Sequence, residues 1–277
     1  MTLPNFLYIG PPKSASTWLF EVLRTHPQVF VPDGKDVYFF DRYFDRGQGW
    51  YEAHFEQANA RHIAIGEISH DYLYSRDAAL RIRAMLPGVK LLTILRNPFD
   101  RSRSDFRYIN QWSANDFTFA EALVRHPTII DNSLYAENLR FYLEVFGHAN
   151  IRVMLYDDLV ANPEKLTQGL LAFLGVNMLE GLPIRARINV SATSRLPRLT
   201  AGARKLAQLA RNAGFSGVIG KLKYSALRQL VFTSAASGEI QIDRESFLRM
   251  QAAFLPDIAA LEEMIGRDLS SWRQAQL

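Results

Sequence analysis

The chain has 277 residues, of which 48% are hydrophobic and 22% charged, with a formal net charge of +4 and no cysteine. The length predicts one domain over residues 1–277, and the apolar fraction is sufficient for a packed core. The absence of cysteine excludes disulfides, thiolate zinc sites and cysteine nucleophiles, and no apolar run is long enough to span a membrane.

The first predicted strand, residues 6–9, ends in an unusual turn. Gly10-Pro11-Pro12 follows it, and two prolines exclude both a strand ladder and a continuing helix there. Apolar residues at helical spacing come next, after one lysine and three hydroxyls: Lys13, Ser14, Ser16 and Thr17. A helix N-terminus has free N–H groups and a positive dipole end, so this stretch predicts an anion site.

A Walker A loop for nucleotide triphosphates is the first alternative for this turn. Walker A requires Gly, four residues and then Gly-Lys-Ser/Thr, whereas here Lys13 follows Gly10 by three positions and Pro12 precedes it. The stretch PPKSASTWL instead resembles the 5′-phosphosulfate loop of sulfotransferases that use PAPS (3′-phosphoadenosine 5′-phosphosulfate), written PKSGTTWL. The resemblance implies that six residues bind PAPS: Lys13, Ser14, Ala15, Ser16, Thr17 and Trp18.

Ala15 stands where the family has glycine. If the position needs a positive φ, alanine costs roughly 1 kcal/mol there, and otherwise little changes. The resemblance also gives Lys13 a catalytic role. With the loop N–H groups, it would stabilise the charge that develops on the bridging oxygen of the departing phosphate.

An aromatic block follows, and core packing is the plain interpretation of most of its rings. In the heparan-sulfate-type branch of the family, a similar segment reads Glu-Val-His-Phe-Phe-Asp and its Glu is the catalytic base. Here the text is Asp36-Val-Tyr-Phe-Phe-Asp41, and the following Arg46-Gly-Gln-Gly-Trp-Tyr51 also resembles that branch's Gly-x-x-Trp-Tyr. Asp36 is therefore one candidate base, and partial burial would raise its pKa toward the working pH.

His70 is the other candidate base. Residues 63–74 predict a strand that runs into a turn, and Gly66-Glu67 resembles the family's Gly-Glu-Lys-Ser/Thr-Pro. Ile68 replaces the lysine of that segment, and His70 replaces the proline. Cytosolic small-molecule sulfotransferases carry a catalytic histidine in a Lys-Thr-His segment at a comparable place. The sequence leaves the choice between Asp36 and His70 open.

A second phosphate motif follows a helix predicted over residues 75–85, with Ser75 as its cap. Residues 89–95 are almost wholly apolar, which predicts a buried parallel strand. Arg96 stands at the carboxyl end of this strand, the edge at which open α/β sheets bind ligands. Asn97-Pro98 then begins a helix that carries Ser104, eight residues after Arg96. The arrangement resembles the family's 3′-phosphate motif, in which Arg96 would grip the phosphate bidentately and Ser104 would donate to it.

Further elements are predicted as helices over 116–126, with Thr118 to Glu121 as a capping box, and over 133–146. A strand over 151–155 follows, and then a helix that Asn162-Pro163-Glu164 caps and that ends at Leu174. Tyr156 follows the strand in a run that resembles the family's Tyr-Glu-Asp-Leu segment, so it is either an adenine contact or a packing residue. The tail, residues 247–269, predicts a helix that Pro256 interrupts.

Residues 181–238 contain ten Lys or Arg and no acidic residue. Arg195-Leu-Pro-Arg198 resembles the loop with which bacterial members close over PAPS, which adds Arg195 and Arg198 to the cosubstrate residues. Residues 199–231 predict basic amphipathic helices. These form either a solvated face or a docking surface for an anionic glycan, a lipid headgroup at the membrane surface, or an acyl carrier protein.

The resemblance covers nearly the whole chain and implies a P-loop-NTPase-like sulfotransferase fold, an α/β domain whose mostly parallel sheet has helices on both faces. It implies in-line transfer of a sulfuryl group from PAPS to a hydroxyl, or less favourably an amine, leaving PAP. The acceptor is expected to be a glycan or glycolipid, with a carrier-bound or small-molecule natural product as the alternative. A kinase with the same fold and a non-catalytic PAP-binding module remain open.

No ligand cluster at metal spacing occurs in the sequence, so no metal is expected, and no nucleic-acid partner either. A strand that begins by residue 6 leaves no room for a signal peptide, which predicts a cytoplasmic protein. The resemblance to bacterial members predicts a bacterial origin.

Overall fold

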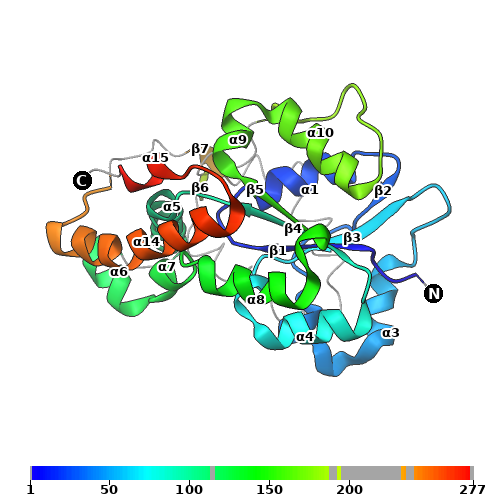
Figure 1. Ribbon diagram of the computed structural model, residues 1–277, viewed down its shortest axis with the longest axis horizontal. Coiled ribbons are helices and arrows are strands. Elements are labelled where there is room, and N and C mark those ends of the chain that lie inside the picture. Colours follow the sequence, from blue (N-terminus) through cyan, green and yellow to red (C-terminus); the bar gives the residue numbers. More distant parts are fainter. Residues whose placement is uncertain (1, 113–115, 187–191, 195–231, 235–239, 275–277) are drawn as a thin grey trace. The chain divides into compact units, whose positions relative to one another are not determined.

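The computed structural model describes residues 2–112, 116–186, 192–194, 232–234 and 240–274 (Figure 1). The chain divides into two compact units, Met1–Arg96 with Asn138–Ile188, and Asn97–Glu137 with Asn189–Leu277. Among the described helices, none is both long enough and apolar enough to cross a membrane.

The first unit is built on a parallel five-stranded sheet with the strand order β2-β3-β1-β4-β5. Its strands are β1 (Phe6–Gly10), β2 (Val29–Phe30), β3 (Ala64–Ile68), β4 (Lys90–Leu95) and β5 (Ile151–Leu155). Every residue of β1 is buried, as expected for a strand covered on both faces. The mostly parallel sheet predicted from the apolar runs is confirmed.

Helices cover both faces of this sheet (Figure 1). One face carries α1 (Ser16–Arg24), α9 (Tyr156–Ala161) and α10 (Pro163–Leu174), and the other carries α3 (Gly47–Glu52), α4 (Arg76–Met85) and α8 (Ala136–Phe146). Short helical turns connect them: α2 (Phe39–Arg42), η1 (Phe44–Arg46), η2 (Ala53–Phe55), η3 (Tyr72–Tyr74) and η4 (His148–Asn150). The predicted N-caps of α4 and α10 are confirmed, because Ser75 and Asn162 each accept a backbone N–H of their helix.

The aromatic block forms core. Four of its rings, Phe39, Phe40, Tyr51 and Phe55, are fully buried, and the buried ring of Tyr72 packs against Phe40. The rings of Phe39 and Tyr51 stack with centroids 4.4 Å apart, and other pairs meet edge to face. Core packing is therefore the correct interpretation of these rings.

The second unit is mostly helical, with α5 (Pro98–Trp112), α6 (Phe119–Arg125), α7 (Thr128–Asp131), α14 (Arg244–Ile265) and α15 (Ser270–Arg273). Two short strands, β6 (Ala192–Ser194) and β7 (Phe232–Ser234), pair antiparallel. The Thr118–Glu121 capping box predicted from the sequence is present at the start of α6.

The predicted interruption at Pro256 was wrong, because α14 continues through this residue. Proline removes one helical hydrogen bond, but Phe254 and Ile258 are buried on either side of it and hold both halves in the core. The next carboxylate, Asp257, accepts the N–H groups of Tyr135 and Ala136 at 2.8 and 2.9 Å. Packing and these bonds outweigh the local preference.

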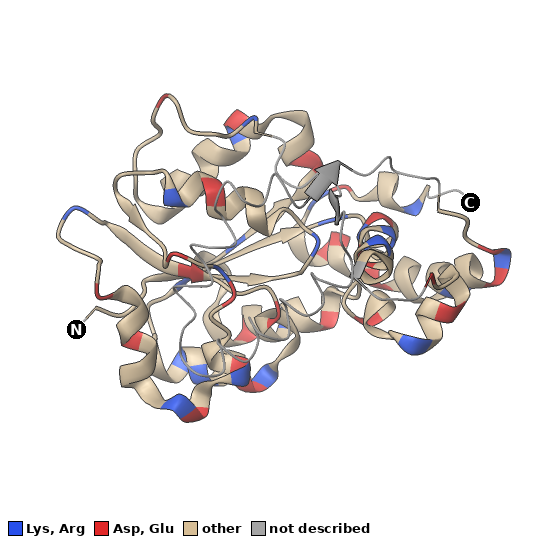
Figure 2. Ribbon diagram, turned by 180° about the vertical axis from the view of Figure 1, so that it is seen from behind, with Lys and Arg blue, Asp and Glu red and all other residues tan. Residues whose placement is uncertain are grey.

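Charged residues lie mostly on the helices and their connections, where basic and acidic positions are interspersed (Figure 2). The basic helices predicted over 199–231, and Arg195 and Arg198, lie outside the described residues. These predictions are therefore not tested by the structure.

Candidate anion-binding and acid-base site

The anion loop, residues 10–17, joins β1 to α1 with an unusual backbone. Lys13 and Ala15 both have left-handed φ angles, 67° and 61°. Ala15 is also the N-cap of α1 and makes no side-chain capping bond, and the N-terminus of a helix is in general suited to binding an anion. The position where the family has glycine therefore has a positive φ in this chain, which is the case in which alanine costs roughly 1 kcal/mol.

The loop contains a buried hydroxyl that has no protein partner. Ser14 is fully buried, and its Oγ makes no hydrogen bond to any described residue. A buried polar group left unsatisfied costs about 1–3 kcal/mol, so an oxygen-rich ligand fits this position. The turn itself is fixed from the sheet, since the Thr93 hydroxyl donates to the Gly10 carbonyl at 2.7 Å.

The other loop residues predicted to bind the cosubstrate differ in their exposure. Ser16 and Thr17 are buried at the start of α1. Trp18 is 5% exposed, and its indole N–H donates to the carbonyl of Ile184 at 2.9 Å. The Trp18 side chain therefore packs within the first unit, and its contact with the cosubstrate stays a prediction.

Arg96 reaches the anion loop from the end of β4. Its guanidinium donates to the Lys13 carbonyl at 3.2 Å and lies over the ring of Tyr156, with Cζ 4.7 Å from the centroid. Parallel strands bring their carboxyl ends to one edge, so β1, β4 and β5 place these three residues together. Tyr156 thereby orients Arg96 by a cation–π contact, while its contact with adenine stays a prediction. Ser104 lies on α5, in the second unit.

The two candidate bases form one pair, the Asp36–His70 dyad. His70 Nδ1 is 2.7 Å from Asp36 Oδ1, and the side chains are 21% and 8% exposed. Asp36 has a left-handed φ of 72°, and its N–H donates to the Ile68 carbonyl at 2.7 Å. Two positions that the sequence offered as alternatives are therefore direct partners.

Tyr38, which sequence reasoning missed, contacts the Asp36–His70 dyad as a third residue. Its Oη is 2.9 Å from His70 Nε2, and the two rings meet edge to face. Burial, together with the carboxylates of Asp36 and Asp71, holds the pKa of Tyr38 well above its usual range. The phenol therefore stays protonated and donates to Nε2, which leaves Nδ1–H to donate to Asp36. The available signal was that Tyr38 replaces the histidine of the family segment.

Charged residues border Tyr38. The guanidinium of Arg42 lies over the Tyr38 ring, with Cζ 4.0 Å from the centroid, and forms an ion pair with Asp71. Burial raises the pKa of Asp41 to about 6. The cation over the ring face holds the phenol in place.

Glu67 forms a buried network beside the dyad. Its carboxyl group accepts hydrogen bonds from Tyr72, Ser69 and Tyr51 at 2.8, 2.9 and 3.0 Å. Burial raises the pKa of Glu67 to about 7, although the three hydroxyls act in the opposite direction. Ser69 Oγ also accepts the backbone N–H of Tyr38 at 3.0 Å. Tyr38 has a left-handed φ of 54°, and Glu67 thus helps to fix this backbone conformation through Ser69.

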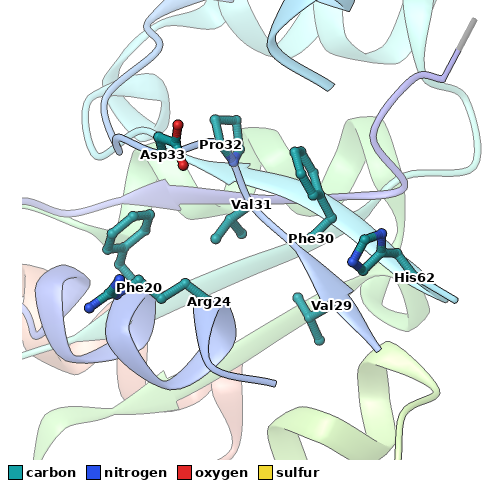
Figure 3. A pocket seen from close by; sticks show the side chains of 8 residues that line it. All are labelled: Phe20, Arg24, Val29, Phe30, Val31, Pro32, Asp33 and His62. Atoms are coloured by element: carbon teal, nitrogen blue, oxygen red, sulfur yellow. The ribbon is translucent and has the colours of Figure 1, made fainter. Parts of the chain in front are cut away.

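A separate pocket lies between α1 and β2 (Figure 3), where Phe20 and Arg24 project from the helix and Val29 and Phe30 from the strand. Arg24 there is paired with Glu21 at 2.6 Å. The anion loop precedes the N-terminus of α1, whereas this pocket contacts the later part of the helix. The residues described include no cluster of three or more side chains suited to holding a metal ion.

The family model and the relatives that match this chain are described as sulfotransferases. A family model for the sulfotransferase domain matches residues 3–197. The chain is 31% identical over 186 residues to the human heparan sulfate glucosamine 3-O-sulfotransferase 3B1, which covers 63% of this chain and 46% of the relative. It is 36% identical over 114 residues to the membrane-associated sulfotransferase kil1 of Dictyostelium discoideum, covering 40% and 24%. The chain spans about half or less of the length of these curated relatives.

Solved structures agree with this description. A sulfotransferase from Alicyclobacillus acidocaldarius has a TM-score of 0.70 at 24% identity, covering 99% of this chain and 100% of that one. A mouse sulfotransferase complexed with PAP has a TM-score of 0.51 at 14% identity, covering 95% and 89%. These likenesses confirm the predicted sulfotransferase fold. Because the family model for the sulfotransferase domain matches most of the chain, the chain belongs to the sulfotransferase family.

Proposed function

We propose that the protein transfers a sulfuryl group from PAPS to a hydroxyl group of an acceptor. The observation that carries the proposal is that one unit contains both an anion loop, with a buried unpartnered Ser14 hydroxyl, and an Asp36–His70 dyad. The loop fits a phosphosulfate because it combines helix N–H groups, hydroxyls and a lysine. A carboxylate–imidazole pair fits the removal of a proton from the attacking hydroxyl.

Binding and orientation fall to the loop and Arg96. The N–H groups at the start of α1 and the ammonium of Lys13 hold the 5′-phosphate and stabilise charge on its bridging oxygen as the S–O bond breaks. Arg96, oriented by Tyr156, holds the 3′-phosphate and thereby aligns the sulfur with the acceptor. The electron pair of the broken bond stays on PAP.

Asp36 accepts the acceptor's proton, and His70 positions Asp36. Both nitrogens of His70 are already engaged, Nδ1 by Asp36 and Nε2 by Tyr38. A carboxylate has about four lone-pair sites, so a carboxylate bound to an imidazole can also accept a hydroxyl donor. This assignment agrees with the position of the catalytic Glu in the heparan-sulfate-type segment.

A glycan or glycolipid is the first acceptor class, with carrier-bound or small-molecule natural products second. Relatives near 30% identity are named heparan sulfate glucosamine 3-O-sulfotransferases. Phe39 and Phe40 are fully buried, so these rings do not stack on a sugar. Cytoplasmic location, bacterial origin and a docking role for residues 199–231 stay predictions.

The test is calorimetric binding of PAP to the unaltered chain, Lys13→Ala and Arg96→Ala. Binding in the micromolar range or tighter is expected, weakened at least tenfold, about 1.4 kcal/mol, in each variant. The exposed Lys165 and Arg61 supply the matched controls Lys165→Ala and Arg61→Ala, which retain the affinity. Absence of PAP binding, or equal loss in the controls, would overturn the proposal, and ATP would be titrated next to test for a kinase.

A further inference from the structure

Lys35 lies outside the anion loop in the sequence, but its ammonium group contacts the loop. Its Nζ donates to the Oγ of Ser16, the first residue of α1, at 3.1 Å. Lys35 directly precedes Asp36, and the N–H of Asp36 is fixed to the Ile68 carbonyl at 2.7 Å. The Lys35 side chain therefore spans from the base to the anion loop.

The surroundings of this ammonium point to a missing anion. Lys35 is half-buried, and no carboxylate among the described residues lies within ion-pair distance of its Nζ. Its neighbour is instead the positive end of the α1 dipole, where a cation is unfavourable unless an anion lies between. The fully buried Ser14 hydroxyl, also without a partner among the described residues, belongs to the same loop.

The other lysines of the first unit have different surroundings. Lys13 belongs to the loop itself. Lys90 donates to the Phe173 carbonyl at 2.7 Å, and Lys165 is exposed on α10. At position 68, where the resembling family segment has lysine, this chain has a buried isoleucine. Lys35 is thus the lysine of this unit that can complement Lys13.

We propose that Lys35 is a catalytic residue that donates hydrogen bonds to the sulfuryl oxygens during transfer, an inference that rests on the proposed function. The acceptor oxygen forms its bond to sulfur while the bond from sulfur to the 5′-phosphate oxygen breaks. Asp36 takes the hydroxyl proton, and PAP keeps the electron pair. The sulfuryl group lies between the leaving phosphate on the loop and the acceptor at Asp36, which is the gap that Lys35 spans. Lys35 transfers no proton.

The experiment measures two quantities for Lys35→Met, Lys35→Arg and the control Lys165→Met. The first is the affinity for PAP, which lacks the sulfuryl group. The second is the single-turnover conversion of radiolabelled PAPS to PAP, with a heparan-type oligosaccharide and with water alone as acceptors. Lys35→Met is expected to slow conversion about a hundredfold and to leave the PAP affinity within about threefold. Lys35→Arg should recover much of the rate, because the charge is retained.

Two results would overturn the assignment. One is conversion by Lys35→Met at the rate of Lys165→Met. The other is a loss of PAP affinity as large as the loss of rate, which would make Lys35 a phosphate-binding residue. Thermal unfolding of each variant serves as the control for whether that variant is folded. If the unaltered chain binds no PAP, the proposed function itself fails, whereas intact PAP binding with unchanged conversion refutes only the role of Lys35.

Discussion

At the scale of single residues, the dyad divides catalysis between a base and its support. Asp36→Asn is expected to lower the single-turnover rate by about a hundredfold or more, because an amide does not accept the proton. His70→Gln should have a smaller effect, because it removes only the group that positions Asp36. Both variants should keep the PAP affinity, since neither residue belongs to the anion loop. A larger loss in His70→Gln than in Asp36→Asn would reverse the two roles.

Ala15 gives a second residue-scale prediction, on stability. Its φ of 61° is left-handed, a conformation that costs a residue with a Cβ about 1–2 kcal/mol, whereas glycine costs about 0.4–1 kcal/mol in the unfolded state. Ala15→Gly should therefore raise the free energy of unfolding by about 0.5 kcal/mol in urea titrations. Ala84→Gly, at an exposed position inside α4, should lower it by about 1 kcal/mol. If Ala15→Gly lowered the free energy of unfolding as Ala84→Gly does, glycine would not relieve the strain at position 15.

At the scale of elements, local signals predict helices and strands well where they are self-contained. The strand over 151–155 and the helix ending at Leu174 have the predicted bounds, and the capping residues Ser75 and Asn162 act as expected. Helices α6 and α8 begin at Phe119 and Ala136, later than the predicted 116 and 133. The failure at Pro256 has a different cause, because burial along α14 is a tertiary effect that no local rule includes.

Helix α5 contains a buried arginine that supports this element. Arg101 is fully buried, and its guanidinium donates to Ser133 Oγ at 2.6 Å, the Ile129 carbonyl at 2.8 Å and Asp105 at 3.2 Å. Arg101→Met should lower the free energy of unfolding by about 3–5 kcal/mol, because Asp105 loses its partner. Arg103→Met on the same helix breaks an ion pair with Asp100, whose side chain is 52% exposed, and should change the free energy of unfolding by less than about 1 kcal/mol. Similar losses in both would contradict the prediction.

At the scale of the whole molecule, the sequence predicts the fold and the anion loop, but not how the acid-base groups combine. The residues of the loop motif are contiguous in the sequence, so the anion-binding residues at positions 13–17 can be predicted from the sequence. The dyad joins Asp36 to His70, which lie 34 residues apart. Asp36 follows β2 and His70 follows β3, and the parallel pairing of these two strands brings the segments after them together. The roles of Lys35 and Tyr38 could not be predicted from the sequence for the same reason, because each depends on a contact with a residue distant in sequence.

The buried carboxyl of Glu67 makes the stability of the molecule depend on pH. Its pKa is about 7 in the folded protein against 4.5 for an ordinary glutamate, so the folded state holds the proton more tightly than the unfolded state. The stability that this group contributes is complete below pH 4.5 and is lost as the pH rises through about 7. By linkage the loss amounts to about 3 kcal/mol.

Glu67→Gln tests this dependence because the amide cannot ionise. The free energy of unfolding of the unaltered chain, minus that of the variant, should fall by about 3 kcal/mol between pH 4.5 and pH 8. Asp41, whose burial raises its pKa to about 6, acts in the same direction in both proteins. Because the charge of Asp41 also raises the pKa of Glu67, the difference contains their mutual interaction and cancels only the rest of the Asp41 contribution. The exposed Glu56 supplies the control Glu56→Gln, for which the difference should stay flat. A flat difference for Glu67→Gln as well would mean that the three hydroxyls keep Glu67 ionised despite its burial.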